Sequence, residues 1–391
     1  MGVGTLSDLM PHDDLDQIRE RFRQYIRENS DTIDRSLPLF FAHVVSALED
    51  GDEELSDPDY NFFLDEIACE IFRNSIRMNH PAFDQELGAI LAKHKRNGGR
   101  GGLDLVSGLH SIRRGLYHNA VLLLKKYRYI DPQIGSAIAY CYIQAGREGA
   151  ETDRPQTDPL LAAREQLMAM SEHRPPLVSH PLLAEDENNL LSSLFWDVYE
   201  QAREWFPHDE WFPEIALSKA SADGDARRYD SVLTEALSSF PDDIRFLRRA
   251  FQGALERQSP ESAAVILQRM IRVMPDGMEP AYYGLKLATI TGKAEIFHRF
   301  RKQAIIRGIP PYLIHLLEYI FELLRRNHEG AVKTRHRFSA LYPRLGYSMD
   351  LFTYLEDDIF SGDPIRQKRG MQALLPIVDR FAMNVLKIGD E

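Results

Sequence analysis

Cysteine is scarce in this chain, since 391 residues hold only Cys69 and Cys141. Two thiols cannot form the disulfide framework of a small secreted protein, and no Cys-x-x-Cys pair offers zinc ligands. Each cysteine lies inside an apolar helical pattern, so we expect two buried, reduced thiols. This usage is typical of a protein of the reducing cytoplasm.

Long hydrophobic runs are also missing. The most apolar segment, residues 312–324, is interrupted by His315, Glu318 and Glu322 and is too short to cross a bilayer. The first residues show no basic stretch followed by an apolar one, so we expect no signal peptide. The sequence therefore predicts a soluble, cytoplasmic protein that binds no membrane.

The chain lacks an excess of basic residues. It contains 47 Lys and Arg residues and 59 Asp and Glu residues, which gives a formal net charge of −12. This balance disfavours bulk attraction to nucleic acid or anionic lipid. A hydrophobic share of 44% is ordinary for a globular protein, so large-scale disorder is not expected.

Catalytic signatures are absent as well, because the sequence holds no Gly-x-Ser-x-Gly elbow and no His-Glu-x-x-His pair. The glycine-rich run at 97–102 lacks the preceding strand of a phosphate loop. It is either a helix connector or a single Arg-Gly-Gly contact for nucleic acid. His110 and His118 lie ~12 Å apart along one predicted helix, too far to share a metal ion. We therefore expect no catalytic residue, no cofactor and no metal, and residues 208–210 are interpreted as surface polar groups.

A regular series of prolines is what the sequence does contain. Neighbouring members are separated by 34, 34, 35 and 33 residues, and each follows a large apolar residue that ends an amphipathic segment. The series is Pro207, Pro241, Pro275, Pro310 and Pro343. This period is typical of two-helix repeats, in which one unit cannot bury its apolar face without its neighbours. We expect antiparallel helix pairs that stack in sequence order.

Each interval reads as a helix, a turn and a second helix. The four turns fall at residues 222–225, 259–261, 292–293 and 327–330. Ala263 and Ala331 stand early in second helices. The arrangement resembles the tetratricopeptide-repeat (TPR) family over about a third of the chain. The first helices depart from that family, because its large aromatic residue and its Leu-Gly pair are largely missing.

The predicted fold class is all-α: a helical bundle, a right-handed TPR-like α-solenoid and C-terminal capping helices. We expect the bundle at 1–150, a proline-rich linker at 151–187, repeats at 188–347 and capping helices at 348–391. Helical spacing predicts four helices between residues 13 and 95, a continuous helix over 103–127 and another over 131–146. A short linker helix over 159–170 is expected to be capped by Thr157 or Asp158.

Charge is distributed unevenly along the chain. Residues 244–344 hold 18 basic against 8 acidic side chains, a balance of +10, so the remainder carries −22. Such asymmetry predicts complementary surfaces. Either the acidic N-terminal domain docks on the repeats or an acidic external partner binds there.

The resemblance to the repeat family implies where a partner binds, because the first helices of that family line a concave face. The matching positions are Arg245, Arg248, Arg249, Gln252, Tyr282, Tyr283 and Lys286. Arginine binds carboxylate bidentately and tyrosine offers rigid contact area, although these positions also fit plain solvated helix faces. The helix at 312–324 is apolar on nearly all sides. Either the C-terminal helices enclose it or it forms an interface, for example with a second copy.

These features favour a non-catalytic adaptor or scaffold that holds an acidic protein or peptide in a basic groove. A ligand-responsive regulator, whose N-terminal bundle senses a small molecule and controls the repeats, stays open. A divergent enzyme or an enzyme accessory subunit is the third alternative.

Overall fold

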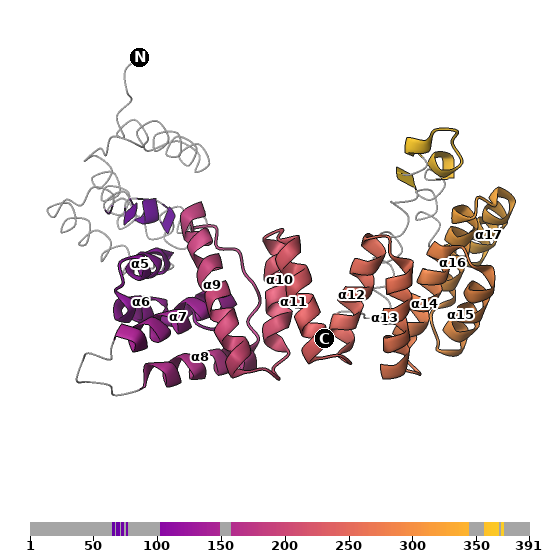
Figure 1. Ribbon diagram of the computed structural model, residues 1–391. Coiled ribbons are helices and arrows are strands. Elements are labelled where there is room, and N and C mark those ends of the chain that lie inside the picture. The colour runs from indigo at the N-terminus through magenta and orange to yellow at the C-terminus, as the bar shows by residue number, and fades with distance from the viewer. Residues whose placement is uncertain are drawn as a thin grey trace, which may run out of the picture. The chain divides into compact units, whose positions relative to one another are not determined.

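The computed structural model describes residues 65, 66, 68–70, 72, 73, 76, 102–148, 158–343, 356–366, 369 and 370. Within these residues the protein is all-α and has no β-strand (Figure 1). The all-α prediction is therefore confirmed, whereas the right-handed solenoid stays a prediction. The helices expected between 13 and 95 lie outside the described residues, except at the few described positions from 65 to 76. The glycine-rich run lies outside them up to residue 101.

The chain divides into two compact units, Met1–Asp225 and Ala226–Glu391. The division falls in the turn that the sequence predicts for the first repeat. Between residues 102 and 222, unit 1 holds six described α-helices and a 3₁₀ turn. They are α5 (Gly102–Arg113), α6 (Tyr117–Leu124), η3 (Lys125–Tyr127), α7 (Pro132–Glu148), α8 (Pro159–His173), α9 (Glu185–Trp205) and α10 (Trp211–Ala222).

The prediction of one continuous helix over 103–127 is wrong, because the structure divides this segment into α5, α6 and η3. α5 ends at Arg113, and Gly115 adopts a left-handed backbone with φ of +72°. The Leu116 amide then donates to the Ser111 carbonyl at 2.8 Å, which closes the helix end. A side chain other than glycine would be strained at that φ, so the chain turns there and restarts as α6.

Other helix boundaries in unit 1 follow the sequence closely. The helix expected over 131–146 is α7, and the linker helix is α8. Of the two expected caps, Asp158 is within the described residues, and its Oδ1 accepts a hydrogen bond from the Leu160 amide at 3.0 Å. Pro159 occupies the first turn, where a missing N–H costs nothing.

The core of unit 1 contains both cysteines. Cys69 and Cys141 are fully buried and unpaired, and they share one apolar cluster with α5, α7 and α9. An ion pair stands beside this cluster, because Arg73 Nη2 meets Glu187 Oε2 at 2.7 Å and Arg73 Nε meets Oε1 at 2.9 Å. Glu187 also accepts from the Ala184 amide at 2.8 Å, so one carboxylate anchors the start of α9.

Unit 2 holds seven described α-helices between residues 226 and 341. They are α11 (Ala226–Ser239), α12 (Ile244–Glu256), α13 (Pro260–Val273), α14 (Met278–Thr291), α15 (Ala294–Ile306), α16 (Pro311–Leu324) and α17 (His328–Leu341). α12 packs on α13, α14 on α15 and α16 on α17, and α13 and α15 each contact the helix that starts the next pair. Within unit 2, successive helix pairs therefore contact one another in sequence order.

Three of the regularly spaced prolines, Pro241, Pro275 and Pro310, lie in the connections that precede α12, α14 and α16. Two arginines of second helices close such connections, since Arg269 donates to the Pro241 carbonyl and Arg307 Nη2 donates to the Pro275 carbonyl at 3.1 Å. Proline has no backbone N–H, but its carbonyl oxygen still requires a hydrogen-bond donor. Each arginine supplies that donor to the proline that precedes its own helix pair.

The apolar helix α16 is enclosed within unit 2. Eight of its side chains are buried, and the neighbouring helices α14, α15 and α17 contact it. Ile359 belongs to the same apolar cluster, and the buried Tyr319 hydroxyl hydrogen-bonds to Glu356. The described C-terminal residues thus cover part of α16, which favours enclosure over an exposed interface.

Candidate partner-binding surface

Helix α12 carries four of the seven sequence-predicted site residues. Its N-cap, Asp243, accepts a hydrogen bond from the Arg245 amide at 2.8 Å. The buried face of α12 consists of Phe246, Leu247, Ala250, Phe251 and Ala254. The spacing of 245, 248, 249 and 252 places the predicted residues together on another side of the helix, where all four are partly exposed. The structure therefore brings these four residues together.

Arg245 is engaged at the helix start. Its Nη2 meets Asp243 Oδ2 at 2.6 Å and its Nε meets Oδ1 at 3.1 Å. Partial burial acts to raise the pKa of the Asp243 carboxyl, but hydrogen bonds from the Arg245 side chain and amide outweigh it. The pKa of Asp243 consequently lies below its ordinary value of 3.8.

Arg248 is engaged across two helices. Its Nε lies 2.6 Å from Glu279 Oε1 and its Nη2 lies 3.1 Å from Oε2, so the fork is bidentate. Glu279 stands in the first turn of α14 and is 9% exposed. The contact joins the first helix of one pair to the first helix of the next.

The three predicted residues on α14 are buried. Tyr282 is 1% exposed, Tyr283 6% and Lys286 2%. The Lys286 ammonium donates to Gln252 Oε1 at 3.1 Å, and the Tyr283 ring lies 4.8 Å from the ring of Phe251. Tyr283 and Lys286 therefore pack against α12, and none of the three buried side chains extends its exposed surface. Burial of α14 on all sides is a tertiary property, which the spacing of its residues does not reveal.

Arg249 differs from its neighbours. It is partly exposed, and within the described part of the chain it makes no ion pair and no hydrogen bond. A guanidinium presents five donors in a planar fork that fits a carboxylate. Of the three arginines predicted as site residues, Arg249 is therefore the one that can pair with an external carboxylate without first breaking another ion pair.

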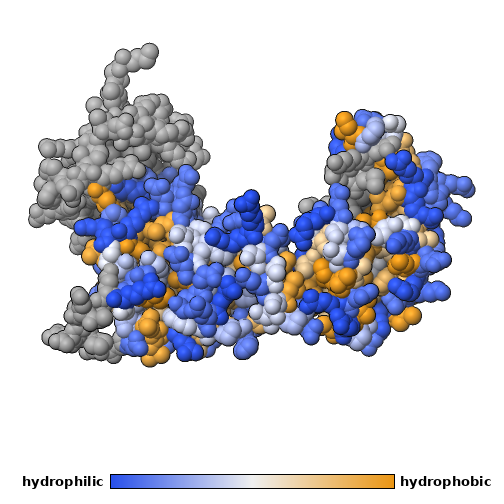
Figure 2. All heavy atoms as spheres, in the orientation of Figure 1, coloured by the Kyte–Doolittle hydropathy of each residue, from blue (hydrophilic) through white to orange (hydrophobic). Residues whose placement is uncertain are grey.

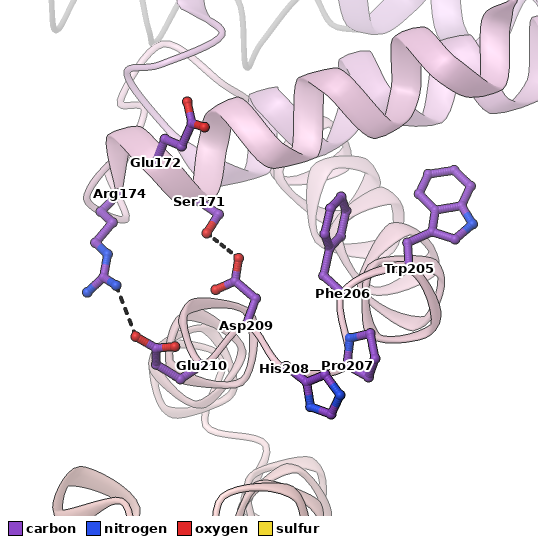
Figure 3. A pocket seen from close by; sticks show the side chains of 9 residues that line it. All are labelled: Ser171, Glu172, Arg174, Trp205, Phe206, Pro207, His208, Asp209 and Glu210. Carbon is purple, nitrogen blue, oxygen red and sulfur yellow. Dashed lines mark hydrogen bonds and ion pairs between the residues drawn. The ribbon is translucent and has the colours of Figure 1, made fainter.

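Unit 1 presents a separate feature, an open cleft of about 660 Å³ (Figure 3). It lies between the end of α8 and the turn from α9 to α10, and Ser171 and Arg174 reach across it to Asp209 and Glu210. Asp209 also caps α10 by accepting from the Trp211 amide at 3.0 Å. The cleft is lined by Ser171, Glu172, Arg174, Trp205, Phe206, Pro207, His208, Asp209 and Glu210. Two of the residues interpreted as surface polar groups are thus held in defined contacts.

No group of three His, Cys, Asp or Glu residues among the described side chains could hold a metal ion. His110 packs its ring edge against Phe72, and burial followed by the charges of Arg114 and Arg113 lowers the pKa of His110. Among the helices that the structure describes, none is long and apolar enough to span a bilayer.

Comparison with known proteins adds no assignment. No protein-family model matches the sequence, and no curated protein matches it at a significant level.

Proposed function

We propose that this protein is a non-catalytic adaptor with a TPR-like solenoid, which holds an acidic protein or peptide segment against α12. The observation that carries the proposal is Arg249, a partly exposed guanidinium without a partner in the described residues. A carboxylate of a bound segment can supply its missing acceptors in a bidentate, charge-assisted contact. The local balance of +10 over residues 244–344 supplies a field that attracts such a segment.

The other site residues take supporting roles in this proposal. Arg245 and Arg248 hold the start of α12 and its contact with α14, since each already pairs with a carboxylate. Tyr283 and Lys286 support α12 by contacting Phe251 and Gln252. The visible surface of unit 2 mixes hydrophilic with apolar residues (Figure 2), which suits an extended peptide that binds by charge and by contact area.

Peptide binding with matched variants tests this function. A fluorescein-labelled decaglutamate peptide is titrated with the full-length protein at low ionic strength, and its anisotropy is followed. R249E should weaken binding by about 3- to 10-fold. R272E, which makes the same charge change at an exposed arginine of α13, should leave it unchanged. Equal weakening by both variants, or none by R249E, would remove the assignment to α12.

The cleft of unit 1 favours a second candidate, a regulator in which unit 1 senses a small molecule. The cleft combines the rings of Trp205 and Phe206 with three carboxylates, so it suits a small cationic or aromatic ligand. In that case the two units, separated between Asp225 and Ala226, should bind one another in solution, and a ligand of the cleft should weaken the association. Separated units that show no affinity for one another would exclude the regulator.

We also infer that the protein acts in the cytoplasm. The buried, unpaired thiols Cys69 and Cys141 fit a reducing compartment.

A further inference from the structure

A polar cluster lies on one face of the otherwise apolar helix α16. His315 and Glu318 are three residues apart, so their side chains are neighbours on the helix surface. Arg337 of α17 brings its Nη2 to 2.7 Å from His315 Nε2, and Arg301 of α15 brings its Nη2 to 3.6 Å from Glu318 Oε2. Two arginines from different helices therefore reach adjacent positions on α16.

The contacts of His315 define its protonation. A guanidinium has only N–H donors, so His315 Nε2 must accept and the ring proton must lie on Nδ1. Nδ1 stands 3.3 Å from the Tyr342 hydroxyl, which can accept that proton in a hydrogen bond. Burial, followed by the charges of Arg337 and Arg301, lowers the pKa of His315, whereas Glu318 acts to raise it. His315 is consequently neutral at pH 7.

The cluster has more donors than acceptors. Arg301 Nε is buried without a hydrogen-bond acceptor and Glu318 Oε2 is buried without a donor, because the 3.6 Å between Arg301 Nη2 and Glu318 Oε2 is too long for a hydrogen bond. Within the described residues, Arg337 contacts the ring of His315 and no carboxylate. Two guanidiniums thus stand near a single carboxylate, and the buried Arg301 Nε is a donor of the kind that is normally satisfied.

We propose that His315, Arg301 and Arg337 form an oxyanion site for a carboxylate or a phosphate group. The oxyanion supplies the acceptors that the two guanidiniums lack. Its charge favours imidazolium over imidazole, so His315 Nε2 takes up one proton from solvent as the ion binds and Arg337 transfers its hydrogen bond to the ligand. This site lies on α15, α16 and α17 and is independent of the peptide surface proposed on α12.

Proton uptake makes the site testable through linkage. If the ion binds better to the imidazolium form, the pKa of His315 must rise on binding, and by reciprocity the affinity must increase as pH falls. Sulfate is the probe for the phosphate class, because it stays divalent between pH 5 and 8 and its own titration does not interfere. Acetate is the probe for the carboxylate class, and sodium chloride at equal ionic strength is the control for screening.

The experiment follows the histidine ring resonances of the full-length protein labelled at histidine, with His315 assigned by its loss in H315Q. Sulfate or acetate should shift the His315 signal saturably and raise its pKa by about half a unit or more, which corresponds to an about threefold preference for imidazolium. R301Q and R337Q should each weaken the binding at least about fivefold. R299Q, at an exposed arginine of the same helix α15, should not.

Each outcome decides the proposal. A response to sulfate alone assigns the phosphate class, a response to acetate alone assigns the carboxylate class, and a response to both assigns a general oxyanion site. A shift no larger than that produced by chloride would overturn the site, and so would a shift that persists in R301Q. The R301Q variant decides the result even if R337Q fails to fold, because Arg301 makes no short hydrogen bond that its loss would break.

Discussion

Arg248 and Glu279 form a bidentate ion pair that joins the first helices of consecutive helix pairs, with contacts of 2.6 and 3.1 Å. The two residues are 31 positions apart, and both are mostly buried. The pair neutralises one of the arginines on α12 and at the same time fixes α12 against α14. Its consequence for function is that Arg249, one position further on, is presented by a helix that is held in place.

Removal of Glu279 should destabilise unit 2. We expect E279A to lower the free energy of unfolding by about 1.5–3 kcal/mol, because the charge-assisted hydrogen bonds of Arg248 lose their acceptor. R245A should cost about 1 kcal/mol or less, since its pair with Asp243 is local and partly exposed. Urea unfolding followed by circular dichroism measures both.

A double-mutant cycle separates the pair from its surroundings. The R248A and E279A substitutions should couple by about 0.5–3 kcal/mol, as contacting residues do. Additive effects would mean that the two side chains do not interact in solution.

The close approach of α14 and α15 depends on Gly284. A Cβ added there would lie 2.1 Å from the Phe300 ring, so the helices must separate or the ring must move. G284A should therefore destabilise the protein by about 1–3 kcal/mol. The matched control is G253A on α12, where the nearest atoms belong to the flexible end of Arg257 at 3.4 Å. That variant should be neutral or stabilising, because alanine has the higher helix propensity.

Both thiols should be unreactive in the native protein. Burial raises the pKa of Cys69 and of Cys141 to about 12, so very little thiolate is present at pH 8. An aromatic disulfide reagent should titrate no thiol in buffer and two in urea. Rapid reaction of one thiol in the native state would show that the core of unit 1 opens.

The neutral state of His315 predicts a pH dependence of stability. The folded pKa lies below the ordinary value of 6.5, so the unfolded chain binds the proton more readily. The contribution of His315 to the free energy of unfolding is therefore fully present above pH 6.5, and it is lost as pH falls through the pKa of His315 in the folded protein. The urea midpoint of the wild type should drop between pH 7.5 and 5.5, and H315Q should drop less. H336Q, at an exposed histidine of α17, should behave as the wild type.

Local features of the fold could be predicted from the sequence because they depend on neighbouring residues. Asp158 and Pro159 start α8, and Gly292, with φ of +65°, ends α14 where a glycine turn was expected. The break at Gly115 was missed, because apolar spacing continues through it and only the left-handed backbone reveals the turn.

The candidate sites could be predicted only in part. The positions on α12 follow from the resemblance to the repeat family, but Tyr283 and Lys286 are buried against residues more than thirty positions earlier in the chain. For the oxyanion site a signal was present, since His315, Glu318 and Glu322 interrupt an apolar helix at helical spacing. Their arginine partners on α15 and α17 could not be read from the sequence.

Photo-crosslinking tests the central claim, that an acidic segment binds beside Arg249 on α12. A decaglutamate peptide with a benzophenone at one end is irradiated with the full-length protein, and the modified residues are mapped by mass spectrometry. The account predicts crosslinks on α12 whose yield falls in R249E and is unchanged in R272E. Crosslinks confined to other helices, or an undiminished yield on α12 in R249E, would contradict it.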